Sequence, residues 1–278
     1  MFLSGYGLYI AYIRSKENGV KKSIWHRSAS LIAKMLFVAI LFYPFAYFFP
    51  ELKWNFTFPK CLLSLVGWGY NSQWWFIRPY LAMLLLSPII IPKYYKYPKT
   101  LISISIVIYI LSAISSQVGI YKSGTLLGEI IQIGRLQLSF ILGLFAAQSN
   151  LLYNSSISQK KKTLLYSILG IAGLIIFMAF FRRELFSPFV TLFFCIFMVR
   201  IKLFDSLNKV LILLGKESTT MWLIHPFICL YYGKNILLQL HYPILILIIT
   251  IVISYILSKF TSNLYKYLMR PKFLYYFR

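Results

Sequence analysis

Long apolar segments fill most of this 278-residue chain, and short connections rich in lysine and arginine separate them. Hydrophobic residues make up 59% of the sequence and charged residues only 13%, whereas a soluble domain carries about 25% charged residues. A soluble core could not hide this much apolar surface, but a lipid bilayer can accept it. The pattern predicts an all-α, polytopic integral membrane protein built as a helical bundle.

Eight apolar segments are long enough, or nearly long enough, to cross the hydrocarbon core as helices. We place them at residues 29–49, 74–92, 100–118, 125–147, 164–181, 186–200, 210–232 and 243–262. The segment 186–200 is short and is expected to pair closely with its predecessor. The apolar stretch 1–13 is too short to span comfortably. The prediction is about eight full spans plus an N-terminal partial helix, in a single domain over residues 1–278.

Lysine and arginine are distributed unevenly between the two sides of this arrangement. Of the 29 such residues, 21 fall on one side and 8 on the other. Because basic residues are retained in cytoplasmic connections, the richer side is expected to be cytoplasmic and to include the C-terminus. The net charge of +23 would suggest nucleic-acid binding in a soluble protein, but no basic stretch is long enough to form a folded soluble module. We expect membrane lipid, and no nucleic acid, as the partner of these charges.

The cysteines and histidines carry no metal-binding pattern. The three cysteines form no CxxC pair, and the three histidines show no HExxH spacing. The sequence therefore predicts no metal site.

One histidine lies inside an apolar segment, where polar groups are rare. His225 precedes Pro226 within the segment 210–232. An imidazole can take up and release protons near neutral pH, which makes His225 a candidate base. The alternative is a structural role, because Pro226 frees a backbone carbonyl one turn earlier that a polar neighbour can satisfy.

Among the charged residues at or inside predicted spans, three are candidates for function, because a charge there is costly and usually faces the bundle interior or a wet cavity. Arg78 follows Trp75 at the outer end of a span, and an arginine in an aromatic setting can stack and bind phosphate or carboxylate. Glu129 can hold an arginine in place or accept a proton. Arg135 lies six residues further along, so the two need not pair directly. The alternative is that all three side chains reach the outer interface as anchors.

Four motifs occur in an order that resembles one family of membrane enzymes. They are Phe2-Leu3-Ser4-Gly5-Tyr6-Gly7-Leu8, Trp75-Phe76-Ile77 with Tyr80 and Ser87-Pro88, Phe140-Ile141-Leu142-Gly143, and Ser218-Thr219-Thr220-Met221-Trp222-Leu223-Ile224-His225-Pro226. Together they resemble the helix motifs of the membrane acyltransferase 3 family and cover nearly the whole chain.

The resemblance implies a ten-helix enzyme of the bacterial inner membrane. Such enzymes move acetyl or similar groups, typically from acyl-CoA, onto cell-envelope glycans. The resemblance therefore implies acyl-CoA as the donor substrate, an envelope glycan as the acceptor and no tightly bound cofactor. The basic residues of segment 14–27 and Lys160–Lys162 could attract the polyphosphate of the donor.

The chain also departs from the family pattern. The family's first helix carries an Arg and a His ten residues apart, and this chain is expected to start after that helix. The family's R-x-x-R pair is incomplete, because Ser30 stands three residues after Arg27. Three explanations for the missing helix are considered, in this order: a misassigned start, a degraded gene, or a partner chain that supplies the helix.

The candidate residues present in the chain predict a division of roles for acyl transfer. His225 is the candidate catalytic base, and Arg78, Trp75, Glu129 and Arg135 are the candidate substrate-binding residues. The main alternative is a transporter or flippase for a polysaccharide or lipid-linked sugar, although the two-half repeat typical of many transporters is not visible. An inactive truncated remnant is the third interpretation.

Overall fold

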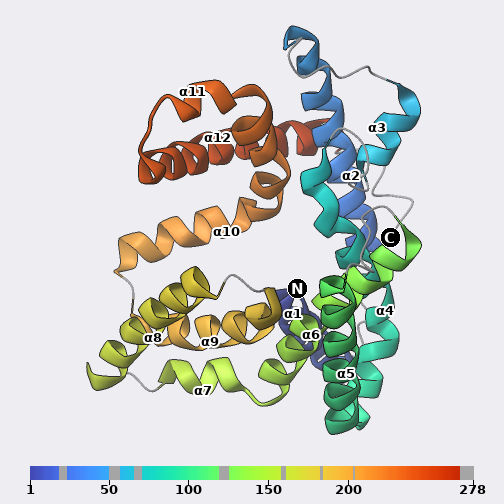
Figure 1. The fold of residues 1–278 in the computed structure, drawn as a ribbon, viewed down its shortest axis with the longest axis vertical. Coiled ribbons are helices and arrows are strands. Elements are labelled where there is room, and N and C mark those ends of the chain that lie inside the picture. The colour runs from blue at the N-terminus through green and yellow to red at the C-terminus, as the bar shows by residue number, and fades with distance from the viewer. Residues whose placement is uncertain are drawn as a thin grey trace. The chain divides into compact units, whose positions relative to one another are not determined.

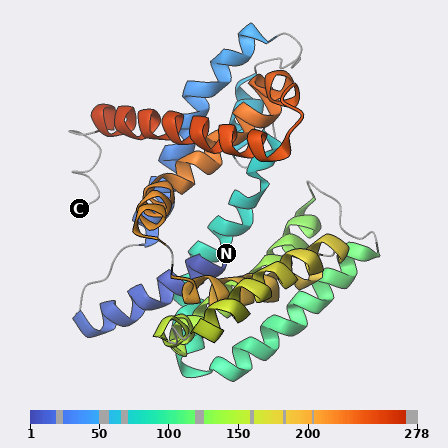
Figure 2. The ribbon, with the colours of Figure 1, turned by 90° about the vertical axis from the view of Figure 1, so that its left-hand side faces the viewer.

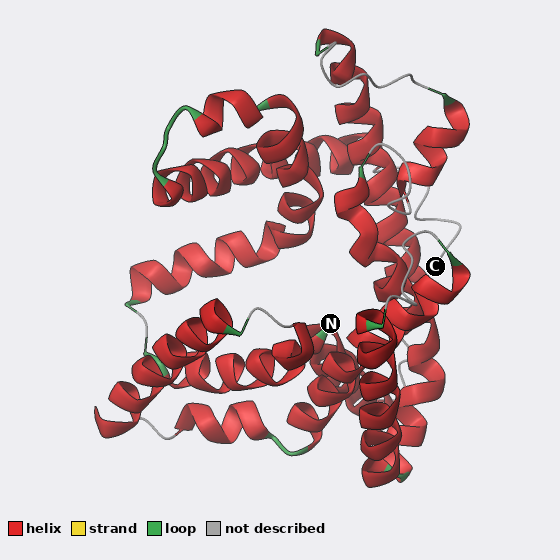
Figure 3. Cartoon of the chain, viewed as in Figure 1, coloured by secondary structure: helices red, strands yellow, loops and turns green. Residues whose placement is uncertain are grey.

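The computed structural model confirms the all-α helical architecture. It describes residues 1–18, 24–49, 57–65, 71–118, 125–157, 161–181, 184–202 and 204–269. Within these ranges the chain is helical and contains no strand (Figure 3). Lys160, the side chains of Lys161 and Lys162, and residues 19–23 between Arg14 and Arg27 lie outside the described residues.

The described helices long and apolar enough to cross a membrane match six of the predicted spans. They are Arg27–Phe48, Gln73–Lys96, Pro98–Gln117, Leu126–Gln148, Thr163–Phe180 and Pro243–Tyr267. The helix Ser187–Arg200 is shorter, as the sequence predicts. The partial helix predicted at residues 1–13 extends over Phe2–Asn18. The segment 210–232 is divided between an α-helix and a π-helix.

The chain forms two compact units. The first consists of Met1–Ile24 and Arg78–Leu203, and the second of Trp25–Ile77 and Phe204–Arg278. Figure 1 labels the helices of both units.

The first unit is built around one buried helix. Its elements are α1 (Phe2–Asn18), α4 (Ile77–Lys96), α5 (Pro98–Gln117), α6 (Leu126–Gln148), α7 (Leu151–Ile157), α8 (Lys161–Phe180), η4 (Glu184–Phe186) and α9 (Ser187–Arg200). Helix α6 packs against α1, α5, α7 and α9. Of the apolar window of α6, 61% is buried, against 6% for α8. An apolar helix with so little burial is suited to face lipid, whereas α6 forms the centre of the unit.

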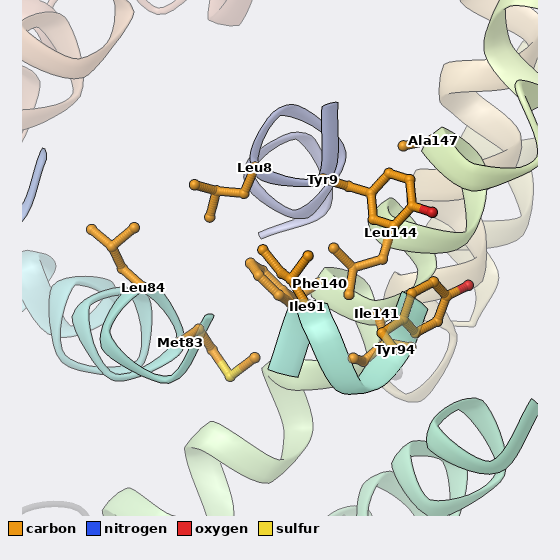
Figure 4. Packing of buried hydrophobic residues seen from close by; sticks show 10 residues of the cluster. All are labelled: Leu8, Tyr9, Met83, Leu84, Ile91, Tyr94, Phe140, Ile141, Leu144 and Ala147. Carbon is orange, nitrogen blue, oxygen red and sulfur yellow. The ribbon is translucent and has the colours of Figure 1, made fainter. Parts of the chain in front are cut away.

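Side chains from α1, α4 and α6 form the main apolar cluster of this unit. Figure 4 shows Leu8 and Tyr9 of α1 and Tyr94 of α4 beside residues of α6 such as Phe140 and Leu144. The Tyr9 and Tyr94 rings meet edge to face, with centroids 6.1 Å apart. Between membrane helices such contacts act mainly through close packing, because lipid tails are as apolar as the side chains themselves.

Two motif glycines allow α1 and α6 to approach closely. A Cβ atom on Gly5 would clash with the Phe140 carbonyl oxygen, and one on Gly143 would clash with the Phe2 carbonyl oxygen. Because both obstacles are backbone atoms, rotamer changes cannot relieve the clash. Small residues at such positions are typical of tightly packed membrane helices.

Replacing Gly143 with alanine is therefore expected to destabilise the first unit. The added methyl group must push α1 away from α6, and overpacking of this kind costs about 1–3 kcal/mol. Thermal unfolding of the purified protein in detergent measures the change. The matched control is Gly7→Ala on α1, because a Cβ atom there would meet no atom of the other described helices within 4 Å. Equal losses of stability in the two variants would contradict this account of the interface.

A second motif explains how α4 accommodates proline within its apolar length. Pro88 has no N–H, so the carbonyl of Leu84 one turn earlier loses its helical donor. Ser87 Oγ donates a 2.7 Å hydrogen bond to that same Leu84 oxygen, and its side chain is fully buried. Pro88 therefore removes one backbone hydrogen bond of the helix, and the Ser87 hydroxyl supplies a replacement donor to the same carbonyl.

The second unit contains two long helices that pack against each other. Its elements are α2 (Ile24–Phe42), η1 (Tyr43–Phe48), α3 (Phe58–Leu65), η3 (Ser72–Phe76), α10 (Asp205–Pro226), η5 (Phe227–Tyr232), α11 (Lys234–Leu238) and α12 (Pro243–Met269). Figure 2 shows α12 as one long helix, and α10 packs against it. The π-helix η5 contacts α10, α11 and α12.

Candidate active site

A hydrogen bond holds the His225 ring in one orientation. Pro226 has no N–H, so the carbonyl of Trp222 one turn earlier lacks its usual helical donor. His225 Nδ1 lies 2.7 Å from that carbonyl oxygen. Because a carbonyl oxygen can only accept, Nδ1 carries the proton, which assigns the tautomer whose lone pair is on Nε2. The arrangement satisfies the freed carbonyl and leaves Nε2 able to accept a proton.

The chain changes its helical form immediately after this histidine. The π-helix η5 follows Pro226, and Gly233 N–H donates to the Ile228 carbonyl five residues earlier at 2.9 Å. Tyr232 at its end donates from its hydroxyl to the Phe42 carbonyl of α2, at 2.6 Å. The Phe42 and Phe227 rings stack with centroids 5.1 Å apart. These contacts fix the position of the chain just beyond the candidate base.

A buried tryptophan joins the Trp-Phe motif to the His-Pro motif. Trp74, in η3, is fully buried, and its Nε1–H donates to the Leu223 carbonyl at 3.1 Å. Phe76 of the same short helix meets Trp222 edge to face, with centroids 6.0 Å apart. Trp75, the predicted substrate-binding residue, is 39% exposed. The sequence did not single out Trp74, since nothing in the local pattern distinguishes these adjacent tryptophans.

The side chain of Asn71 caps this short helix. Asn71 is fully buried, and its Oδ1 accepts from Gln73 N–H at 3.1 Å and from the Tyr231 hydroxyl at 3.5 Å. Among the residues that the structure describes, its Nδ2 has no hydrogen-bond partner. A buried donor left unpaired is costly, so Asn71 can supply a hydrogen bond to a bound acceptor group. The sequence analysis missed this residue as well.

In the first unit, an ion pair joins two of the predicted binding residues. Arg78 Nε lies 2.7 Å from Glu129 Oε2, and the two side chains are 12% and 14% exposed. Glu129 occupies the first turn of α6, where the helix dipole favours a negative charge. The Thr125 hydroxyl accepts from Gly128 N–H at 3.0 Å and caps the same turn. Glu129 therefore holds an arginine in place, which was one of the roles considered for it.

Arg135 lies further along α6 and contacts α5. Its Nη1 donates to Ser116 Oγ of α5 at 3.2 Å. Nearby on the same two helices, Ser105 Oγ donates to Gln137 Oε1 at 2.6 Å, and Gln137 Nε2 donates to the Ser105 carbonyl at 2.7 Å. The α5–α6 interface is therefore polar as well as apolar, and it fixes the helix that carries Arg135.

The five predicted site residues thus fall into two separate groups. Arg78, Glu129 and Arg135 belong to the first unit, while His225 and Trp75 belong to the second. Across the described part of the chain, no three His, Cys, Asp or Glu side chains gather as a metal site would require.

Comparison with known proteins connects this geometry to a reaction class. A family model for an acyltransferase domain matches residues 1–259. The chain belongs to the membrane acyltransferase 3 family. No curated protein and no solved structure matches it. The matched range includes both residue groups, so family membership confirms the resemblance seen in the motifs and supports a multi-pass membrane acyltransferase.

Proposed function

We propose that this family member moves an acetyl or similar acyl group from acyl-CoA to a hydroxyl of a cell-envelope polysaccharide or its precursor. The observation that carries the proposal is the orientation of His225, whose Nδ1 is tied to a backbone carbonyl and whose Nε2 is left as a proton acceptor. The family match supplies the reaction class.

The proposed reaction needs one base and one charge stabiliser. His225 Nε2 takes the proton from the acceptor hydroxyl while the hydroxyl oxygen attacks the thioester carbonyl carbon. The new C–O bond gives a tetrahedral oxyanion, which collapses with cleavage of the C–S bond. The leaving thiolate takes up the proton held by the histidine, so the products are an O-acyl ester and free CoA. Donors placed where the oxyanion forms lower the barrier.

The other predicted residues have binding roles in this proposal. Within the first unit, Arg78 and Arg135 supply positive charge for binding an anionic substrate group, and Glu129 keeps Arg78 in a fixed orientation. Trp75 offers an exposed aromatic face of the kind on which sugar rings or cations can pack. Asn71 Nδ2 is a further donor for a substrate oxygen. In this proposal acyl-CoA is a substrate that is consumed, and the reaction as written uses no tightly bound cofactor or metal.

The proposed location is the inner membrane of a bacterium, with the C-terminus in the cytoplasm. The uneven distribution of lysine and arginine supports this orientation. With this orientation, cationic connections would face the compartment that contains acyl-CoA and would raise the local concentration of a polyanionic donor.

Deleting the gene in its native host tests the proposal. We expect the envelope polysaccharide to lose alkali-labile acyl esters, measured by NMR of the purified polymer, while the amount of polymer at the cell surface stays unchanged. Expression of the wild-type chain should restore the esters. Loss of the polymer itself would favour a transporter or flippase, and unchanged ester content would favour an inactive remnant; either result contradicts the proposal.

A further inference from the structure

A cavity in the second unit lies away from His225 and is lined by three lysines. It lies between α2, α10 and α12 and has a volume of about 200 Å³. A site needs only roughly 10–15 Å³ on this kind of measure to hold one water, so the space can accept a polyatomic group. Its lining residues are Lys34, Phe37, Val38, Lys216, Glu217, Thr220, Thr261, Ser262, Tyr265 and Lys266.

The charge of the cavity wall favours an anion. Lys34, Lys216 and Lys266 bring three ammonium groups, and Glu217 brings one carboxylate. Ser262 Oγ already donates a 2.7 Å hydrogen bond to Glu217 Oε2, so part of that carboxylate's capacity is used within the wall. The lysines come from three different helices, and an anion between them would reduce the repulsion among their charges.

The same wall offers hydroxyl groups and an aromatic edge. Thr220 and Thr261 are buried, and Thr220 Oγ1 lies 3.5 Å from Ser262 Oγ. On another side, Phe37 and Tyr265 meet edge to face with centroids 5.4 Å apart. Ammonium and hydroxyl donors beside an apolar surface suit a phosphate group attached to an apolar body.

We propose that this cavity is a binding site for a phosphate group, contributed by the headgroup of an anionic phospholipid or by a soluble phosphate compound. Basic pockets between membrane helices on the cytoplasmic side are known to hold anionic headgroups. Under the charge-derived orientation, all three lysines lie on that side. The proposal does not depend on the transfer reaction, because none of the lining residues has a role in it.

The test compares two pairs of lysines on the same two helices. The cavity variant is Lys216→Gln with Lys266→Gln, and the control is Lys209→Gln with Lys259→Gln, which removes the same charge from α10 and α12 outside the cavity. Native mass spectrometry with phosphatidylglycerol and phosphatidylcholine measures lipid retention. Thermal shift with inorganic pyrophosphate measures binding of a soluble phosphate.

Each lysine near a charged surface contributes about a fivefold change in affinity, so the cavity pair should weaken binding about 25-fold. Preferential retention of phosphatidylglycerol by wild type and control, lost in the cavity variant, supports the lipid source. Thermal stabilisation of wild type and control by pyrophosphate, lost in the cavity variant, supports the soluble source. No selectivity for either ligand, or equal losses in both lysine pairs, overturns the proposal.

A variant that is expected to bind more tightly provides a second test, because misfolding cannot increase binding. Glu217→Gln removes the only carboxylate among the lining residues and keeps a group that can accept from Ser262. We expect the better of the two ligands to bind about fivefold more tightly, because one opposing charge is gone. Unchanged or weaker binding in this variant, when it unfolds at the wild-type temperature, also overturns the proposal.

Discussion

Replacing His225 with asparagine is expected to lower acyl transfer by about 10²–10⁴-fold while leaving the fold intact. Asparagine places an amide N–H near the position of Nδ1, so it can still donate to the Trp222 carbonyl that Pro226 leaves free. It has no basic nitrogen, so the acceptor hydroxyl would lose its proton acceptor. Transfer from radiolabelled acetyl-CoA to isolated polysaccharide, by the purified protein in lipid nanodiscs, measures the loss.

The alanine variant separates the chemical role of this histidine from its structural role. His225→Ala removes both the base and the donor to Trp222, so it should lose activity and also unfold at a lower temperature than His225→Asn. An unpaired carbonyl of this kind costs about 1–3 kcal/mol. If His225→Asn keeps wild-type activity, the side chain serves only to satisfy the Trp222 carbonyl, and the proposed base must be another residue.

The membrane spans could be predicted because length and apolarity are local properties of the sequence. The prediction for residues 210–232 was less complete, since the apolar character continues through Pro226 while the hydrogen-bonding pattern changes there. Without the proline N–H, the chain continues from Phe227 to Tyr232 as a π-helix. The apolar pattern marked where a helix would form, and the proline marked where its geometry would change.

The contacts that build the candidate site are long-range and could not be read from local patterns. Arg78 and Glu129 are 51 positions apart, and Trp74 reaches Leu223 across 149 positions. The motifs indicated the right segments, but helix packing decides which of Trp74 and Trp75 is buried. The role of His225 as a donor to a freed carbonyl was foreseen as an alternative, because Pro226 follows it directly.

Breaking the Arg78–Glu129 pair is expected to have the largest effect on stability. Glu129→Gln leaves the Arg78 charge without its carboxylate at a position where both side chains are mostly buried. Removal of one partner from a buried ion pair costs roughly 3–5 kcal/mol. Thermal unfolding in detergent should show a large downward shift. The control is Lys93→Met on α4, the helix that carries Arg78. It removes an exposed charge and should change the free energy of unfolding by no more than about 0.5 kcal/mol.

A double variant then decides whether the pair also binds substrate. Arg78→Met with Glu129→Leu replaces both charges with apolar side chains, and such replacements often restore the stability that a single change removes. If Arg78 contacts the substrates as proposed, the double variant should regain its unfolding temperature but remain deficient in acyl transfer, mainly through a higher KM. Recovery of both stability and activity would assign the pair to packing of α4 against α6 alone. Stability that stays as low as in Glu129→Gln would mean that the cost arises from lost packing rather than from an unpaired charge.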